Sequence, residues 1–72
     1  MKLEIYIGKT LYGFCNGYFG RDSYDDKKIV YVGDNYIVAE NENGYPETAI
    51  FEGMKESEVH ELISDWLIKD EY

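Results

Sequence analysis

The chain has 72 residues, with 15 acidic and 7 basic side chains and a formal net charge of −8. This length predicts a single domain, residues 1–72, held by packing, because one cysteine and one histidine exclude an intramolecular disulfide and a zinc cluster. The negative charge argues against direct binding to nucleic acid and against adsorption to an anionic membrane.

The N-terminal residues show two strand-like patterns. In KLEIYIG, Leu3, Ile5 and Ile7 alternate with other residues, which predicts a strand over about residues 2–8 with one buried face. Asn16-Gly17 is typical of a type I′ turn and predicts a short hairpin over residues 11–20. Because MKLEIYIG has neither the apolar run nor the cleavage site of a signal peptide, a cytoplasmic protein is expected.

The remaining residues predict a second hairpin, a further strand and a helix. KIVYV and YIVAE are rich in β-branched and aromatic residues and predict strands over residues 28–33 and 36–41. Pro46 fits the beginning of a strand over about residues 47–52. Val59, Leu62, Ile63 and Trp66 recur with a helical period, which predicts a helix over about residues 55–69. The expected fold is α+β, an antiparallel β-meander of four to five strands with one C-terminal amphipathic helix packed on one face, centred on Trp66.

No pattern of catalytic or cofactor-binding residues is evident. GFCNGYFGRD, residues 13–22, lacks the Lys-Ser/Thr pair and the following helix of a phosphate-binding loop, so it is interpreted as a turn. Cys15 and His60 could form a nucleophile and base only if they met in space, and a structural cysteine and a boundary histidine are the simpler interpretation. We therefore expect no enzyme activity, no metal and no cofactor.

All of the excess negative charge lies in residues 36–72, which hold ten of the acids and two of the bases. Glu58, Glu61 and Asp65 fall on the helix face opposite the apolar stripe and span about 10 Å, with Ile68 beside them. This face is either an ordinary solvated surface or a docking surface for a basic protein partner. The second interpretation is favoured by Glu40, Glu42 and Glu47, which crowd the preceding hairpin and would support the same surface.

The whole chain, short, acidic and rich in tyrosine, resembles the small inhibitors that bacteriophages and prophages encode, including anti-CRISPR proteins and DNA mimics. YGFCNGYFGRDSY, residues 12–24, is similar to segments of uncharacterised phage-type proteins, a resemblance that names no particular family. The resemblance implies an inhibitor in the host cell cytoplasm that presents carboxylates where a nuclease or other nucleic-acid enzyme expects phosphates.

The alternative is a regulatory or scaffold binding module. Eight tyrosines are too many for the core of so small a chain, and exposed tyrosine is typical of protein interfaces. In this interpretation the hairpin at residues 13–22 contacts the partner through Tyr18, Phe19 and Arg21, and the acidic half serves only solubility.

Overall fold

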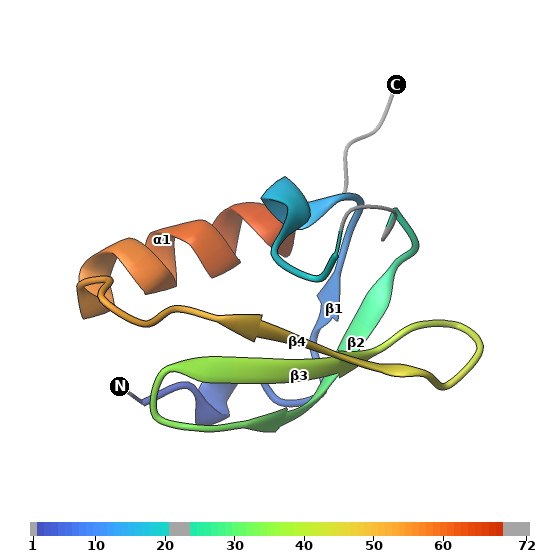
Figure 1. Cartoon of the computed structure of the whole chain (residues 1–72), viewed down its shortest axis with the longest axis horizontal. Helices are drawn as coiled ribbons and strands as arrows, with labels where there is room; N and C mark the ends of the chain where they lie inside the picture. Colours follow the sequence, from blue (N-terminus) through green and yellow to red (C-terminus); the bar gives the residue numbers. More distant parts are fainter. Residues whose placement is uncertain (1, 21–23, 69–72) are drawn as a thin grey trace.

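A computed structural model of the chain describes residues 2–20 and 24–68 (Figure 1). The elements in chain order are the 3-10 helix η1 (Glu4–Tyr6), β1 (Thr10–Leu11), the 3-10 helix η2 (Cys15–Gly17), β2 (Lys27–Val32), β3 (Tyr36–Glu40), β4 (Pro46–Ile50) and the helix α1 (Glu56–Trp66). The strands form one antiparallel sheet in the order β1-β2-β3-β4. The predicted α+β meander with a C-terminal helix is confirmed, and within the described residues it has four strands.

The hairpin of β2 and β3 follows the predicted alternation closely. Ile29, Ile37 and Ala39 are buried on the face that packs into the core, and their neighbours along the strands are exposed or half-buried. The register shifts by one residue between Ile29 and Tyr31, so that Val30 forms a β-bulge. Both Val30 and Tyr31 are therefore exposed.

In the turn between β2 and β3, the ring of Tyr36 occupies the space that a side chain at Gly33 would need. A Cβ added there would lie 2.1 Å from Cε1 of Tyr36. We therefore expect Gly33→Ala to lower the free energy of unfolding by about 1–3 kcal/mol, measured as a lower urea midpoint. In a Tyr36→Ala background the same substitution should cost little, and an equal loss in both backgrounds would contradict this explanation.

The prediction of a strand over residues 2–8 is wrong. Leu3 and Tyr6 are the buried residues, three positions apart, while Ile5 is 66% exposed and Ile7 is 49% exposed. The amide of Tyr6 donates to the carbonyl of Leu3 at 3.0 Å, which closes one turn of 3-10 helix. The alternation of apolar residues led to the wrong prediction because the side chains that enter the core here are three positions apart in the chain, not two.

The predicted hairpin over residues 11–20 is also wrong. β1 ends at Leu11 and pairs with β2, and Asn16-Gly17 lies inside η2. Asn16 and Gly17 do adopt the positive φ angles expected of this dipeptide, at 53° and 76°, but Cys15 does so as well, at 52°. Three successive left-handed residues coil the chain locally, so the residues after the turn do not return alongside those before it.

α1 lies along one face of the sheet, and η2 lies beside its C-terminal end (Figure 1). Val59, Ile63 and Trp66 are the buried residues of α1, at the spacing that the apolar stripe predicted. α1 is shorter than predicted and ends at Trp66, while residue 69 lies outside the described residues. β4 begins at Pro46, as expected, and ends at Ile50. Among the described residues, no helix has the length and the apolar character that crossing a membrane requires.

Candidate functional site

The three helix acids lie together on the exposed side of α1. Glu58, Glu61 and Asp65 are all exposed, whereas Val59 and Ile63 between them are completely buried. A helix of 3.6 residues per turn places positions 58, 61 and 65 in one row, as the spacing predicted. α1 therefore carries a line of carboxylates along one side.

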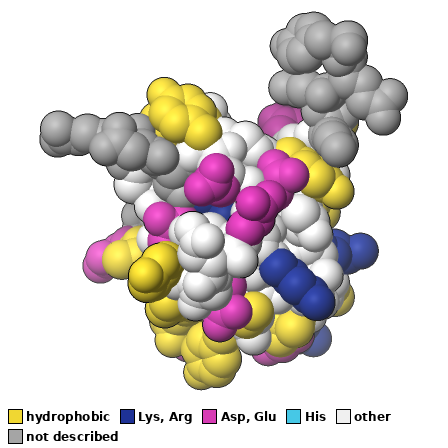
Figure 2. Space-filling view, turned by 90° about the vertical axis from the view of Figure 1, so that its right-hand side faces the viewer, with side chains coloured by type: hydrophobic (Ala, Val, Ile, Leu, Met, Phe, Trp, Pro, Cys, Tyr) yellow, Lys and Arg dark blue, Asp and Glu magenta, His cyan; other side chains and the backbone are white. Residues whose placement is uncertain are grey.

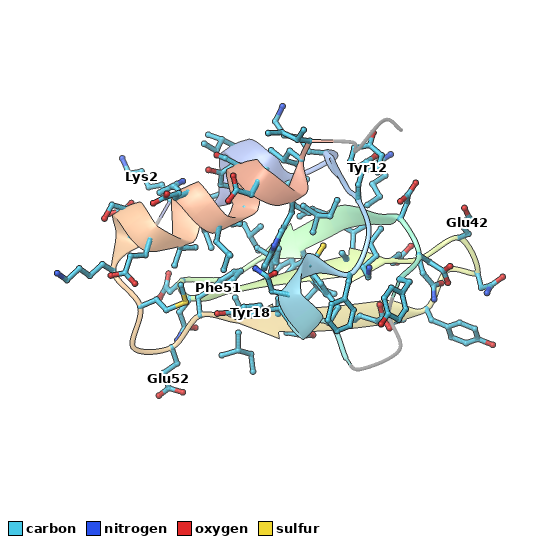
Figure 3. All side chains as sticks on the ribbon, turned by 90° about the horizontal axis from the view of Figure 1, so that it is seen from above. Lys2, Tyr12, Tyr18, Glu42, Phe51 and Glu52 are labelled. Carbon is cyan, nitrogen blue, oxygen red and sulfur yellow. The ribbon has the colours of Figure 1, made fainter. Side chains whose placement is uncertain are left out.

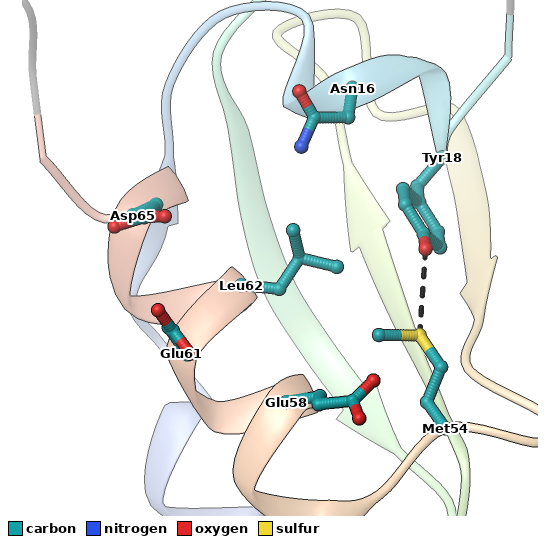
Figure 4. Close-up of a pocket in the computed structure, with 7 residues that line it drawn as sticks. All are labelled: Asn16, Tyr18, Met54, Glu58, Glu61, Leu62 and Asp65. Atoms are coloured by element: carbon teal, nitrogen blue, oxygen red, sulfur yellow. Dashed lines mark hydrogen bonds between the residues drawn. The ribbon is translucent and has the colours of Figure 1, made fainter.

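This row borders a hollow of about 310 Å³ between α1 and the segment that contains η2. Figure 4 shows the carboxylates along the helix, Leu62 pointing into the hollow, and Tyr18 and Met54 opposite. The hydroxyl of Tyr18 donates to Sδ of Met54 at 3.5 Å, which links two residues of the wall opposite α1. The lining residues are Asn16, Tyr18, Met54, Glu58, Glu61, Leu62 and Asp65, with no lysine or arginine among them.

A second hollow, also of about 310 Å³, adjoins the first at the C-terminal end of α1. Asn16 and Asp65 line both hollows, which therefore adjoin one another beside α1, and the two hollows together are here called the α1 groove. Ile68, which is 65% exposed, lines the second hollow. The four predicted residues Glu58, Glu61, Asp65 and Ile68 therefore border two adjoining hollows.

Glu40, Glu42 and Glu47 do not belong to that surface. Glu40 and Glu42 line a separate hollow of about 220 Å³, together with Lys27 and Lys28. Glu40 is the register partner of Lys28 across β2 and β3. Glu47 lies on β4 and is half-buried. Figure 3 shows Glu42 at the end of the molecule away from α1, and Figure 2, which looks at that end, shows acidic side chains with basic ones near them.

The residues of the alternative site are divided by the structure. Tyr18 is half-buried in the wall of the α1 groove, where its ring packs against Phe51 with centroids 5.6 Å apart (Figure 3). Phe19 is only 5% exposed, so the expectation that it presents an exposed aromatic surface is wrong. It was expected outside because it sat in a presumed hairpin, whereas the left-handed turn at η2 folds it inward. Arg21 lies outside the described residues.

A buried lysine, which the sequence did not reveal, holds the groove segment against the sheet. Lys27 is 1% exposed, and its Nζ donates to the carbonyl of Gly13 at 3.1 Å and to that of Asp25 at 2.6 Å. The same ammonium lies 5.4 Å from the centre of the Phe19 ring. These contacts satisfy a buried charge and fix the loop that carries Asn16 and Tyr18. In the sequence, Lys27 is one of several charged residues in a polar loop and carries no distinguishing signal.

Cys15 and His60 have separate partners in the structure. The hydroxyl of Tyr6 forms a hydrogen bond of 2.5 Å with Nδ1 of His60, and Nε2 of His60 lies 3.6 Å from Oε1 of Glu56. Sγ of Cys15 lies 3.6 Å from the carbonyl oxygen of Tyr12. Neither contact joins a nucleophile to a base. In residues 2–20 and 24–68, no group of three or more histidine, cysteine or acidic side chains is placed to hold a metal ion.

The thiol of Cys15 is expected to react slowly. Burial raises its pKa, the ammonium of Lys27 opposes the rise, and the carboxylate of Asp26 adds to it. Iodoacetamide should therefore modify Cys15 at least tenfold more slowly in the folded chain than in urea, and equal rates would contradict the burial.

The same pKa shift links Cys15 to stability. Because the folded state holds the thiol proton more tightly, this contribution to stability is complete below the unfolded pKa and is lost as the pH rises toward the folded pKa. The free energy of unfolding should therefore fall above about pH 8.5, and less so in Cys15→Ala. Urea titrations of the original chain and of Cys15→Ala between pH 7 and 10 measure how the free energy of unfolding depends on pH in each. The same pH dependence in both would contradict this prediction.

Comparison of the chain with protein-family models, with curated proteins and with solved structures finds no significant match. A function is therefore inferred from the residues and geometry of the chain itself.

Proposed function

We propose that this chain is a protein-binding domain that docks the α1 groove onto a basic surface of another protein. One observation carries the proposal: Glu58, Glu61 and Asp65 lie in a row beside a hollow whose other walls include Leu62, Met54 and Tyr18. A plainly solvated acidic face needs no hollow of this kind.

The lining of the α1 groove suits arginine or lysine side chains of a partner. Carboxylates at the rim would pair with the cationic head, while Leu62 and Met54 would cover its aliphatic stem. Tyr18 adds an aromatic ring against which a guanidinium can stack. Since no base lines the described groove, the carboxylates have no neighbour there to neutralise them.

The partner that we propose is a nucleic-acid enzyme, blocked at its nucleic-acid site. Three carboxylates over about 10 Å of α1 give one charge per about 5 Å, about two thirds of the charge density of a DNA strand, which has one phosphate per 3.4 Å of helix axis. A cleft lined with lysine and arginine would accept such a row in place of phosphates. The resemblance to phage inhibitors points in the same direction.

We expected Glu40, Glu42 and Glu47 to support the same docking surface as the helix acids. In this proposal they do not contact the partner. Because they lie away from the α1 groove, they would act through the field of the molecule, which has a net charge of −8. Such a field raises the rate of encounter with a basic partner without making contacts. Neutralising Glu42 should therefore slow association and leave dissociation unchanged.

Capture at increasing salt tests the proposal. The tagged chain is incubated with extract of its native host, and bound proteins are released in steps from 50 to 500 mM NaCl. We expect the captured proteins to bind nucleic acid, and we expect the amount retained on the tagged chain to fall about tenfold or more over this range, because salt screens the charge pairs at the interface. Capture only of proteins that resist high salt would contradict it.

A further inference from the structure

The α1 groove contains a buried donor in addition to its carboxylates. Trp66 lines the second hollow, the one at the C-terminal end of α1. It is only 4% exposed, and its indole Nε1 has no hydrogen-bond acceptor among the described residues. A buried donor without an acceptor lowers stability, so such groups are rare in folded proteins. A partner that supplied an acceptor in the second hollow would remove this cost.

The first hollow, between α1 and the η2 segment, suits a cation. Glu58, Glu61 and Asp65 border it, and none of them forms an ion pair with a described residue. Figure 4 shows the side chains of Leu62 and Met54 facing the space beside these carboxylates. The first hollow therefore combines negative charge at its rim with apolar surface inside.

The two hollows are neighbours of similar size. Each measures about 310 Å³, and Asn16 and Asp65 line both. This volume is at the lower end of the range for small-ligand sites, about 300–1,000 Å³. An occupant of both hollows needs a cation on an apolar stem and a hydrogen-bond acceptor close to it. One basic residue of a peptide has both, in its side chain and its main-chain carbonyl.

We propose that the α1 groove binds one arginine residue of its partner. The guanidinium lies among the carboxylates of the first hollow, and the main-chain carbonyl of the same residue accepts a hydrogen bond from Nε1 of Trp66 in the second. This inference rests on the proposed function and adds to it the residue that the groove recognises. Because Nε1 is closed to solvent in the free chain, a small movement of the side chains around it accompanies binding.

Arginine fits the first hollow better than lysine does. Glu61 lies three positions after Glu58 and four before Asp65, so neighbouring members of the row are about 5–6 Å apart at Cβ. A planar guanidinium with five N–H donors can bond two such carboxylates at once, whereas an ammonium is a compact and more strongly hydrated donor. The ring of Tyr18, in the wall opposite α1, offers the guanidinium a surface on which to stack.

NMR titration of the isotope-labelled chain with small probes tests the inference. Trp66 is the only tryptophan, so its indole N–H gives a single signal. The probes are N-acetylarginine methylamide, the corresponding lysine compound, and ethylguanidinium, which has the cation and no carbonyl. The arginine compound should bind with a dissociation constant of about 1–10 mM and move the indole signal downfield. Ethylguanidinium should move the signals of Leu62 and Met54 and leave the indole signal in place.

Two comparisons separate the contributions of the two hollows. The lysine compound should bind about fivefold more weakly than the arginine compound. Trp66→Phe keeps most of the ring and removes the donor, so the affinity for the arginine compound should fall about fivefold, toward that of ethylguanidinium. Glu61→Gln should weaken both guanidinium probes. Glu52→Gln, the matched control, changes the net charge equally outside the groove and should weaken neither.

Three results would overturn the inference: no binding of the arginine compound up to about 50 mM, equal affinities for the arginine and lysine compounds, or an indole signal that stays in place at saturation. None of them would contradict the proposed function, because salt-sensitive capture of a basic partner needs only cations at the carboxylates. Capture that resists high salt contradicts the proposed function whatever the indole signal shows. The two proposals can therefore fail separately.

Discussion

Replacing Trp66 with alanine is expected to lower the free energy of unfolding by about 3–5 kcal/mol. Trp66 is 4% exposed, and its ring centre lies 5.3 Å from Tyr18, 5.8 Å from Phe19 and 5.9 Å from Phe51. It joins α1, the η2 segment and the end of β4 in one aromatic cluster. A chain of this length is stable by only about 4–11 kcal/mol, so much of its stability would be lost. Urea denaturation followed by circular dichroism measures the change.

A conservative substitution separates lost packing from lost hydrogen bonding. Nε1 of Trp66 is buried and has no hydrogen-bond acceptor among the described residues. Trp66→Phe removes that unsatisfied donor while it keeps most of the ring, so it should cost clearly less than Trp66→Ala, about 1–2 kcal/mol. Equal losses for the two variants would show that the ring contacts are not the main contribution.

Reversing the three carboxylates of α1 is expected to weaken binding to a basic partner about 100-fold or more. In the triple variant Glu58→Lys, Glu61→Lys and Asp65→Lys, three attractive contacts become repulsive. A total of about 3 kcal/mol corresponds to this factor at 1.4 kcal/mol per tenfold. All three side chains are exposed, so the fold should be retained. Titration calorimetry with the captured partner gives the dissociation constants.

A matched variant distinguishes the contribution of the α1 groove to binding from that of the net charge. Glu4, Glu42 and Glu52 are exposed, and none of them lines the α1 groove. Their combined replacement by lysine changes the net charge as much as the helix reversal does. It should reduce affinity only through weaker steering, about tenfold or less. If both triple variants lost the same affinity, net charge would account for binding and the α1 groove would not.

The sequence predicted best where one pattern decided the local structure. The β2–β3 hairpin has β-branched and aromatic strands around a short polar turn, and Ile29 and Ile37 are buried as their alternation indicated. The stripe of α1 was equally clear, because Val59, Ile63 and Trp66 leave only one face for the core. The exposed row of Glu58, Glu61 and Asp65 follows from the same periodicity.

Prediction failed where tertiary packing overrode the local pattern. Leu3 and Tyr6 reach the core at a spacing of three, and Tyr6 is held there by His60, which lies 54 residues away in the chain. For the same reason, the residues of the groove wall opposite α1 could not be predicted from the sequence. Tyr18 and Met54 form the far wall of the α1 groove, yet 36 residues separate them, and no spacing rule connects a turn with a helix start.

Competition with nucleic acid tests the central claim most directly. The captured enzyme is saturated with a fluorescent duplex, and the chain is added while anisotropy is recorded at 100 mM NaCl. We predict complete displacement at about one chain per enzyme, and no displacement by the variant in which Glu58, Glu61 and Asp65 are lysines. A ternary complex of enzyme, duplex and chain, or equal displacement by both chains, would contradict the proposal that the α1 groove occupies a nucleic-acid site.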